Sequence, residues 1–366
     1  MPNKILVFHS PWPTDVDINA GSKLRPLEMK RALERLDIDI IVVDGYSNER
    51  KKSWEKVDEN LANIIGLYSE LRTIPLALSD SDHIPRHPAM DLIYFRKLQK
   101  QGIPTTAFYR DIYWRFPFYS SMLPLHKRLP TLLFYYLEFY FLKKYLSHIF
   151  VPSLRIAEHF PLSVPSTKVS ALPPGCDAVD IGAHQMREHP LNLFYVGGIL
   201  PPVYSFHSLL STLSHSDDVN LTLCFRKDEW DIVRSDYQLP NNVTVIHESG
   251  NDVIQRLSTC DALIMYWDIN PYMEFAMPIK LFQALGLGVP IITNSFCDMG
   301  DFVRKENIGW ALDSTEELAE LLSRISKSPL ELKQKRDNAK QRRWSHTWDA
   351  RAKDIVDVVE KISKSN

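Results

Sequence analysis

Residues 277–294, MPIKLFQALGLGVPIITN, constrain the fold of this chain more than any other segment. Their first half has helical spacing, with Lys280 and Gln283 three residues apart and therefore on one face. Pro278 suits the first turn of a helix, and Gly286 suits its end. The β-branched, apolar run that follows predicts a central parallel strand. A helix that leads directly into such a strand indicates an α/β domain.

The start of this predicted helix also carries a functional hypothesis. Backbone N–H groups without helical partners, with Lys280 beside them, form a corner that suits a phosphate group. Such a corner beside a parallel sheet is where α/β domains often hold nucleotides. An ordinary amphipathic helix with an exposed lysine is the alternative explanation of the same residues.

The first half of the chain alternates apolar runs with longer segments, as a parallel sheet with helical crossovers requires. It opens with a strand at 4–9, a helix at 24–36 and a fully buried strand at 38–43. Further candidate strands lie at 64–68, 92–94, 105–109 and 148–152. The run 92–94 is equally compatible with a helix that continues to Gln99. We expect 148–152 to be the last strand of this half.

The second half repeats this alternation without repeating the sequence. Its predicted strands lie at 192–196, 221–225, 243–246, 262–266 and 289–293, the last of the series. The junction falls near 172–188, where prolines, a glycine and polar residues interrupt the pattern. A chain of 366 residues fits two domains of about 150 to 200 residues. We therefore predict domains at 1–172 and 173–343, and a terminal amphipathic helix within 344–366.

Composition narrows the class of protein. An apolar content of 45% and a formal net charge of −2 are typical of a soluble globular protein, with no general affinity for nucleic acid. The four cysteines lack metal-site spacing and are expected to be buried thiols. The start MPNKILVFHS predicts a strand rather than a signal peptide, and no run reaches the ~20 apolar residues of a membrane span. We expect a cytoplasmic protein, soluble or bound to the inner face of the membrane.

The pattern Pro-x-Lys-Leu-x-x-x-x-x-x-Gly-x-Pro-x-Ile that starts at Pro278 resembles the donor-binding segment of GT-B glycosyltransferases. Family-4-like members carry a ribose-binding glutamate where this chain has Gln283. The xanthan-type glucuronosyltransferase family is similar in its Met-Lys pair and following glutamine. Ser345 and Trp348 also resemble the start of the GT-B terminal helix. This resemblance implies two Rossmann-like domains facing a cleft, with that helix crossing back to the first domain.

The predicted second domain offers several donor-binding candidates. Gly197 and Gly198 follow a predicted strand, where the backbone can approach a ligand closely, although a simple tight turn explains them equally well. Tyr266 ends another strand, so its ring can stack on a base or shape the base pocket. Arg226 follows a third strand, and its alternative is a solvated loop residue. With Met277, Lys280 and Gln283, these residues make up the expected site.

Glu248 enters the donor set by resemblance to the glucuronosyltransferase family, although a surface carboxylate is the more common outcome at a strand end. Family-4-like enzymes place an arginine and a lysine after the glycine loop to clamp the diphosphate. This chain has neither there, so Lys280 and Arg226 are expected to supply that charge. We expect no metal and no cofactor, because no Asp-x-Asp motif ends a strand and a helix dipole with lysine can balance the leaving charge.

The acceptor candidates lie in the predicted first domain. Residues 108–114 place a carboxylate among aromatic rings and an arginine, and they resemble a GT-B segment that faces the cleft. Asp111 is our candidate for the base that deprotonates the acceptor; an ion pair with Arg110 or a helix cap explains it equally well. Tyr113 and Trp114 complete this group. Arg25, on the first helix, is expected to meet an anionic acceptor or diphosphate, and a solvent-facing arginine is its alternative.

Residues 115–146 are rich in aromatic and basic side chains and contain Pro124 and Pro130, so the helix is expected to begin near Leu129. Such a helix can hold a protein in the headgroup layer of an anionic membrane. A core helix with lysines reaching the surface at its ends explains the same residues.

These observations predict a glycosyltransferase that moves a sugar from a nucleoside diphosphate sugar to a glycan or lipid-linked glycan. By resemblance, the donor is a UDP-sugar, with UDP-glucuronate among the candidates, and the pathway is bacterial surface polysaccharide synthesis. Two alternatives stay open. One is a non-catalytic subunit that binds nucleotide sugars or glycans, because a fold does not fix a function. The other is a GT-B sugar-nucleotide epimerase, which needs no acceptor.

Overall fold

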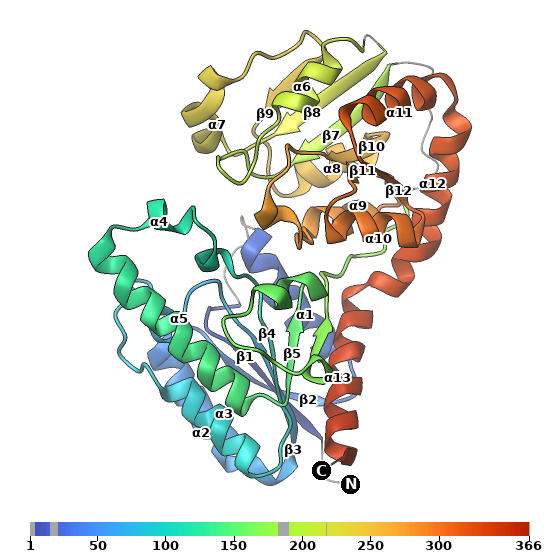
Figure 1. The fold of residues 1–366 in the computed structure, drawn as a ribbon. Helices are drawn as coiled ribbons and strands as arrows, with labels where there is room; N and C mark the ends of the chain where they lie inside the picture. The colour runs from blue at the N-terminus through green and yellow to red at the C-terminus, as the bar shows by residue number, and fades with distance from the viewer. Residues whose placement is uncertain (1–3, 15–20, 182–189, 217, 366) are drawn as a thin grey trace. The chain divides into compact units, whose positions relative to one another are not determined.

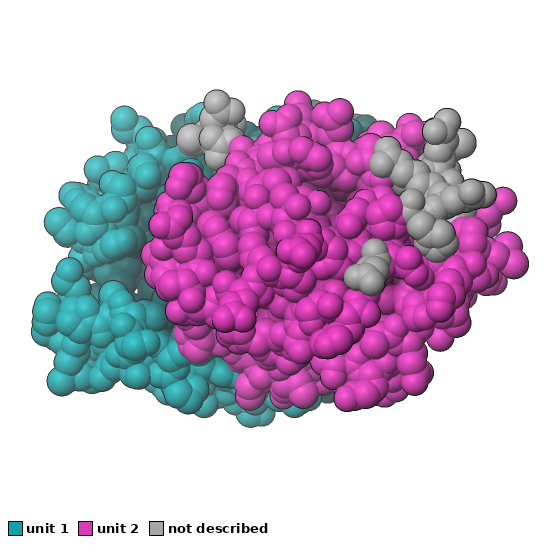
Figure 2. All heavy atoms as spheres, turned by 90° about the horizontal axis from the view of Figure 1, so that it is seen from above, with its two compact units in different colours: residues 1–173, 348–366 teal, residues 174–347 magenta. Residues whose placement is uncertain are grey.

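The computed structural model describes residues 4–14, 21–181, 190–216 and 218–365 (Figure 1). The chain divides into two compact units, coloured separately in Figure 2. Unit 1 comprises Met1–Pro173 together with Trp348–Asn366, and unit 2 comprises Pro174–Thr347. The division falls after Pro173 and after Thr347, where the sequence predicted boundaries after residues 172 and 343.

Unit 1 is built on a six-stranded parallel sheet with the order β2-β1-β3-β4-β5-β6. Its strands are β1 (Ile5–Ser10), β2 (Asp39–Asp44), β3 (Ile64–Glu70), β4 (Thr105–Phe108), β5 (His148–Val151) and β6 (Val169–Ala171). The order reverses direction between β1 and β3. In open parallel sheets, ligands bind at the carboxyl ends of the two strands that flank such a reversal.

Helices cover both faces of this sheet. They are α1 (Gly21–Glu34), α2 (Ser47–Glu59), α3 (Met90–Lys100), the short α4 (Tyr119–Met122), α5 (Leu125–Tyr145) and α13 (Trp348–Ser365). One face carries α1 and α13, where Met29 and Ile355 join Leu6 and Tyr68 in a buried cluster. On the other face, Trp54 of α2 packs on His9 of β1.

Unit 2 has a second six-stranded parallel sheet, ordered β12-β11-β10-β7-β8-β9. Its strands are β7 (Leu191–Val196), β8 (Val219–Cys224), β9 (Val243–Ile246), β10 (Ala262–Met265), β11 (Ile291–Asn294) and β12 (Gly309–Leu312). Numbered from β7, this is the 3-2-1-4-5-6 order of a Rossmann sheet. Its point of reversal lies between β7 and β10.

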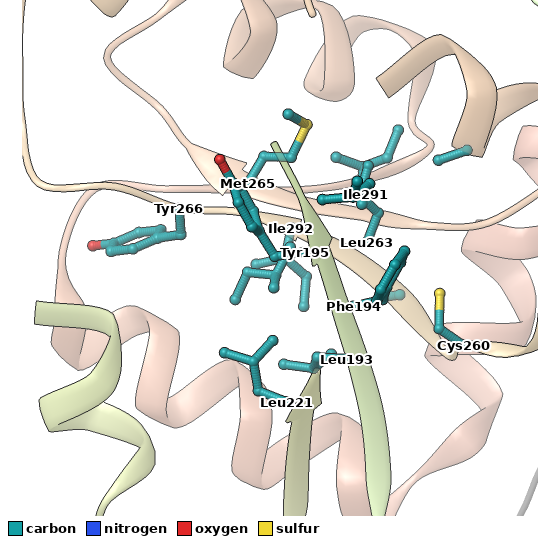
Figure 3. Packing of buried hydrophobic residues seen from close by; sticks show 14 of the residues in the cluster. Leu193, Phe194, Tyr195, Leu221, Cys260, Leu263, Met265, Tyr266, Ile291 and Ile292 are labelled. Atoms are coloured by element: carbon teal, nitrogen blue, oxygen red, sulfur yellow. The ribbon is translucent and has the colours of Figure 1, made fainter. Parts of the chain in front are cut away.

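The helices of unit 2 run between and after these strands. They are α6 (His207–Leu213), α7 (Lys227–Val233), α8 (Asn251–Thr259), α9 (Ile279–Gly286), α10 (Asp298–Glu306), α11 (Thr315–Lys327) and α12 (Pro329–Arg342). The core lies around the central strands, where Leu193, Leu263 and Ile292 are buried together (Figure 3). This burial explains why β10 is apolar along its whole length and why β7 and β11 are mostly apolar rather than alternating.

The predicted fold class is confirmed, because both halves of the chain form parallel sheets with helices in between. The prediction for 92–94 resolves in favour of its helical alternative, since these residues belong to α3. The prediction that 38–43 is fully buried was wrong. Strand β2 is the edge of its sheet, pairs only with β1, and is half-exposed along most of its length.

Each sheet also has one strand that the sequence did not predict. Strand β6 follows β5, and β12 follows β11, so neither 148–152 nor 289–293 is the last strand of its half. Both extra strands are short edge strands of three and four residues. An edge strand pairs on one side only, so it needs no long apolar run and gives a weak sequence signal.

The helix expected near Leu129 begins earlier, at Leu125, and contains Pro130. The first turns of α5 are exposed, so water can bind the carbonyl group that the proline leaves without its helical partner. At the other end of the chain, residues Arg343–His346 form a 3₁₀ turn and α13 begins at Trp348. No helix within the described ranges has the length and apolar character needed to cross a membrane.

Candidate functional site

The glycine pair Gly197-Gly198 follows β7 at the point of reversal of the unit 2 sheet. The Tyr195 hydroxyl donates a hydrogen bond to the Gly198 carbonyl oxygen at 2.8 Å. A Cβ atom at Gly198 would lie 2.6 Å from the ring of Tyr204, and one at Gly197 would lie 2.5 Å from the Tyr195 hydroxyl. The glycines are therefore required for packing the loop onto two tyrosines, in agreement with the tight-turn explanation.

The loop after β10, which is the other strand at the reversal of the sheet order, is held in place by Asn294 at the end of β11. The Asn294 side chain accepts a hydrogen bond from the Trp267 backbone N–H at 2.9 Å and donates one to the Trp267 carbonyl at 3.0 Å. Tyr266 is only 5% exposed and belongs to the core (Figure 3). Of the two roles predicted for its ring, this burial favours shaping a pocket over stacking on a base.

Helix α9 carries Lys280 and Gln283 at its start. Because β10 and β11 are parallel, the crossover helix between them begins on the side of the strands' carboxyl ends, so Lys280 lies at the ligand-binding edge of the sheet. Burial lowers the pKa of the Lys280 ammonium, and the nearby Cys224 thiol at the end of β8 offsets part of that effect. Among the residues that the structure describes, Lys280 has no hydrogen bond or salt bridge.

Gln283 lies one turn after Lys280, and its side-chain oxygen is buried without a hydrogen-bond partner in the described part of the chain. An unpaired buried amide oxygen costs free energy, which a ligand that donates a hydrogen bond would recover. Met277, just before the helix, packs partly buried against the core. An uncompensated lysine and an unpaired amide therefore lie next to each other at the carboxyl edge of a Rossmann sheet.

Two further predicted donor residues are occupied by other side chains of this chain. Arg226 caps α7, is mostly exposed, and pairs with Glu229 at 2.8 Å. Glu248 pairs with Arg256 through both carboxylate oxygens at 2.8 to 3.2 Å. Their geometry agrees with the alternatives of a solvated loop residue and a surface carboxylate.

In unit 1, the carboxylate of Asp111 accepts hydrogen bonds from the backbone N–H groups of Ile112 at 2.6 Å and Tyr113 at 3.1 Å. These bonds hold the carboxylate of Asp111 just before the 3₁₀ turn Tyr113–Arg115, whose N-cap residue is Ile112. Asp111 is half-buried rather than enclosed.

Arg25 is not the solvent-facing residue of the alternative hypothesis, because it is 2% exposed. Its Nε lies 3.0 Å and 3.3 Å from the two Glu70 carboxylate oxygens, and its guanidinium lies 3.5 Å from the Phe108 ring centre. Arg110 lies 3.9 Å from the same carboxylate. One buried carboxylate thus faces two arginines at the carboxyl ends of β3 and β4.

Tyr113 and Trp114 pack against α5. The Tyr113 and Tyr135 hydroxyls are 2.9 Å apart, and the Trp114 ring stacks on that of Tyr135 with centres 4.7 Å apart. Trp114 is buried, and its indole N–H donates to the Tyr109 hydroxyl at 3.3 Å. Trp114 is therefore enclosed by aromatic side chains, whereas half-buried Tyr113 lines a cavity of about 570 Å³ beside α4 and α5.

Helix α5 combines the two explanations offered for residues 115–146. One face is buried through Tyr135, Phe139 and Leu142. The opposite face exposes an apolar stripe at helical spacing, formed by Leu125, Leu129, Leu133, Leu137 and Tyr140. Exposed basic residues lie at both ends of the helix, namely His126, Lys127, Lys143 and Lys144.

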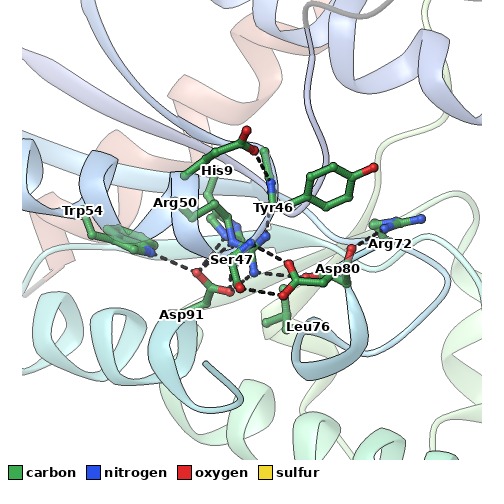
Figure 4. Close-up of polar contacts among 12 residues, drawn as sticks. His9, Tyr46, Ser47, Arg50, Trp54, Arg72, Leu76, Asp80 and Asp91 are labelled. Atoms are coloured by element: carbon green, nitrogen blue, oxygen red, sulfur yellow. Dashed lines mark hydrogen bonds and ion pairs between the residues drawn. The ribbon is translucent and has the colours of Figure 1, made fainter. Parts of the chain in front are cut away.

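Unit 1 also contains a buried network of polar side chains around His9 of β1 and Asp91 of α3 (Figure 4). Asp91 accepts hydrogen bonds from Arg50 at 2.8 Å and from the Trp54 indole at 2.9 Å. His9 Nδ1 lies 2.7 Å from the Ser69 hydroxyl, and His9 Nε2 lies 3.3 Å from Asp91. The row Ser69, His9, Asp91 has the order of a hydrolytic triad, but all three side chains are buried, so no substrate reaches them.

The sequence analysis missed three residues at these edges. Asn294 is the last residue of the segment 277–294 and of strand β11. A polar residue at the end of a buried strand is the sequence signal that could have identified it. Trp12 and Arg72 follow β1 and β3, and only the order of the strands shows that they are neighbours. The four cysteines are buried free thiols. No group of three His, Cys, Asp or Glu side chains in the described ranges is placed to hold a metal ion.

Residues 255–346 match the family model of the glucosyltransferase 3-like, C-terminal domain. Sucrose-phosphate synthase of Thermosynechococcus elongatus is similar in structure, with a TM-score of 0.64, 13% identity and 100% of both chains covered. HepE of Anabaena, solved with UDP and glucose, has a TM-score of 0.61 and 13% identity over 97% of this chain and 99% of its own.

WaaG, a glycosyltransferase involved in lipopolysaccharide biosynthesis, has a TM-score of 0.58 and 13% identity over 97% of this chain and 99% of its own. No curated protein sequence matches this chain. The fold class is nevertheless defined, because the chain has the two-domain GT-B fold of these glycosyltransferase neighbours. Within that class, the match to residues 255–346 identifies the later part of unit 2 as similar to glucosyltransferase 3-like C-terminal domains, and this part contains Lys280 and Gln283.

Proposed function

We propose that this protein is a glycosyltransferase that transfers a sugar from a UDP-sugar to a glycan or lipid-linked glycan acceptor. The observation that carries the proposal is the unpaired, half-buried Lys280 beside the unpaired amide oxygen of Gln283, within the segment that matches the glucosyltransferase model. A diphosphate would satisfy the lysine, and a ribose hydroxyl would satisfy the amide. UDP is proposed as the nucleotide because HepE was solved with UDP and a related α-glucosyltransferase with UDP-glucose.

The donor half of this proposal is tested by calorimetric binding of UDP-, GDP-, ADP- and dTDP-sugars, with UDP-glucose and UDP-glucuronate as separate samples. Lys280→Ala should weaken binding of the preferred donor at least about tenfold, because a charge-assisted phosphate contact is lost. Lys227→Ala, which removes an exposed lysine of unit 2, is the matched control. If no nucleotide sugar binds the native protein, the donor assignment is wrong.

Asp111 is proposed as the base that receives the acceptor proton, and its two backbone hydrogen bonds hold the carboxylate in place for that role. Asp111→Asn keeps one acceptor oxygen for the turn but cannot take up the proton. Transfer should then fall by two or more orders of magnitude, roughly the contribution of a general base, with donor affinity unchanged. Near-normal transfer by this variant would leave Asp111 with a structural role only.

The same measurements separate the other candidate activities. An epimerase would convert the nucleotide sugar without any acceptor, which analysis of the recovered nucleotide sugar detects. A binding subunit would bind donor and yield no product with any acceptor in a glycan and lipid-linked panel. Transfer to one acceptor class, with loss in Asp111→Asn, is the outcome that we expect.

We also propose that unit 1 contacts the surface of an anionic membrane through α5, where a lipid-linked acceptor would be found. The exposed leucine stripe and the basic residues at the two ends of the helix support this, because such a helix combines apolar burial with attraction to anionic lipid. Leu129→Asp with Leu133→Asp should abolish sedimentation with phosphatidylglycerol vesicles. Ile232→Asp, at an exposed apolar residue of unit 2, is the control. Equal sedimentation of both variants would remove the membrane role.

A further inference from the structure

A small pocket lies at the point of reversal of the unit 1 sheet. Its cavity of about 90 Å³ is lined by Ser10 at the end of β1, Glu70 at the end of β3, and Arg110 just after β4. This is the position at which open parallel sheets bind ligands. The residues that were predicted to bind acceptor include Arg110 but not the other cations that line this pocket.

Trp12 forms one wall of the pocket between two cations. The Arg72 guanidinium lies 3.8 Å from the centre of its ring, and the Lys23 ammonium lies 5.0 Å from it. Arg72 donates a hydrogen bond to the Ser79 carbonyl oxygen at 2.9 Å. Lys23 has neither a hydrogen bond nor a salt bridge among the described residues. The indole ring therefore positions two positive charges at the same opening.

The pocket has more positive than negative charge. Lys23, Arg72 and Arg110 line it, whereas the carboxylate of Glu70 is already engaged by buried Arg25. Burial lowers the pKa of Arg72, Tyr46 offsets part of that effect, and the positive charges of Arg110 and Arg50 add to the lowering, so that the pKa falls to about 10. Like charges gathered in this way are stabilised when an anion binds between them.

One hydrogen-bond donor among the residues that line the pocket is also unused. The indole N–H of Trp12 is buried without a hydrogen-bond partner in the part of the chain that the structure describes. Buried donors are normally paired, so an unpaired donor beside an excess of positive charge indicates a missing acceptor of hydrogen bonds. An oxyanion supplies both the negative charge and the acceptor atoms.

We propose that this pocket binds a phosphate group carried by the acceptor. Phosphate fits the observations better than a neutral sugar hydroxyl, because it offers charge to three cations and an acceptor oxygen to the unpaired indole N–H. Thr73 lines this pocket, and the next residue, Ile74, lines the 570 Å³ cavity beside α5. The acceptor class that matches both is a phosphate joined to an apolar chain. Only the identity of this carrier rests on the proposed function; binding of phosphate in unit 1 does not.

The experiment follows the indole N–H resonance of Trp12, assigned with Trp12→Phe, in protein labelled with ¹⁵N. Inorganic phosphate, glucose 6-phosphate and dihexanoyl phosphatidic acid are the probes, and glucuronate tests a carboxylate. Phosphate should shift the Trp12 resonance in the native protein and in Lys280→Ala, which excludes the unit 2 site as the cause. Arg72→Gln should raise the apparent Kd at least about tenfold. Arg31→Gln, an exposed arginine of α1, should behave like the native protein.

Arg72→Lys keeps the charge and should retain more affinity than Arg72→Gln, so lost charge is separated from lost packing. If Arg72→Gln does not fold, Lys23→Gln replaces it, because this side chain has no hydrogen bond to lose. Phosphatidic acid binding more tightly than glucose 6-phosphate supports a lipid carrier, and the reverse order supports a soluble sugar phosphate. An unchanged Trp12 resonance with every phosphate probe would overturn the proposal. UDP-sugar binding in the same samples reports on the proposed function separately.

Discussion

The charges near the carboxyl edges of the two sheets differ in how far they are paired within the chain. In unit 1, the buried guanidinium groups of Arg25 and Arg50 are paired with Glu70 and Asp91, and Lys23, a cation without a partner among the described residues, lies at the surface pocket. In unit 2, Lys280 is half-buried without any such partner in the described ranges. The comparison teaches that pairing, rather than the presence of charge, distinguishes a structural network from a surface that awaits a ligand.

The largest expected effect concerns the buried ion pair between Asp91 and Arg50 in unit 1. Burial alone would raise the pKa of the Asp91 carboxyl, but Arg50 and His9 lower it well below its ordinary value. Asp91→Ala leaves the buried Arg50 guanidinium uncompensated, which should cost about 3 to 5 kcal/mol in urea unfolding. Asp58→Ala breaks the exposed pair with Lys97 and should cost at most about 1 kcal/mol. Equal losses of unfolding free energy in the two variants would mean that the cost of breaking an ion pair in unit 1 does not depend on its burial.

The second prediction concerns Glu138, a buried carboxyl of unit 1 that has no cationic partner among the residues that the structure describes. Burial raises its pKa to about 8, although the Leu76 backbone N–H donates a hydrogen bond to it. The folded state therefore keeps a proton that the unfolded state has lost, and this stability is present below about pH 4.5 and disappears as pH rises through about 8.

Native protein should thus lose up to about 1.4 kcal/mol of unfolding free energy per pH unit from this group across that window. Glu138→Gln should flatten the pH dependence of urea midpoints, whereas exposed Glu59→Gln should leave it unchanged. A slope that is identical in Glu138→Gln and native protein would show that Glu138 ionises normally in the fold.

A third, smaller effect is expected at the buried amide of Gln283 in unit 2. Gln283→Leu removes an amide oxygen that has no partner, so the unfolding free energy should stay constant or rise by up to about 1 kcal/mol. Affinity for the UDP-sugar should nevertheless fall about tenfold, because the ligand loses a hydrogen bond. Gln255→Leu on α8 is the matched control. A loss of stability without loss of affinity would assign Gln283 to the fold.

The smallest effect is expected for Arg226 and Glu248. The sequence predicted both in the donor site, but in the structure each forms an ion pair with another side chain of unit 2. Arg226→Gln breaks the pair between an exposed guanidinium and the buried Glu229 carboxylate, and Glu248→Gln weakens the pair with Arg256. Each should change donor affinity by less than about twofold in calorimetry, because both side chains are engaged by other residues of the chain. A tenfold loss in either variant would restore that residue to the donor site.

Some elements of the fold and of the candidate site could be predicted from the sequence, and others could not. The buried central strands were predictable because apolar runs such as 289–293 record burial on both faces. The short edge strands β6 and β12 were not, because an edge needs few apolar residues. Lys280 and Gln283 could be predicted as neighbours because they lie in one continuous helix. The phosphate pocket could not be predicted, because Lys23, Trp12 and Arg72 are separated in sequence and meet only through the strand order β1 next to β3.

Unit 1 is discontinuous, since α13 contributes Trp348, Ala352, Ile355 and Val359 to a core whose other buried members precede residue 174. Unit 2 is one continuous stretch of chain. During synthesis, which delivers the chain from its N-terminus, unit 2 emerges complete before the helix that closes the core of unit 1. The domain that starts first is thus the one that finishes folding last, and until then its apolar surface over β1 and β3 is open to chaperones.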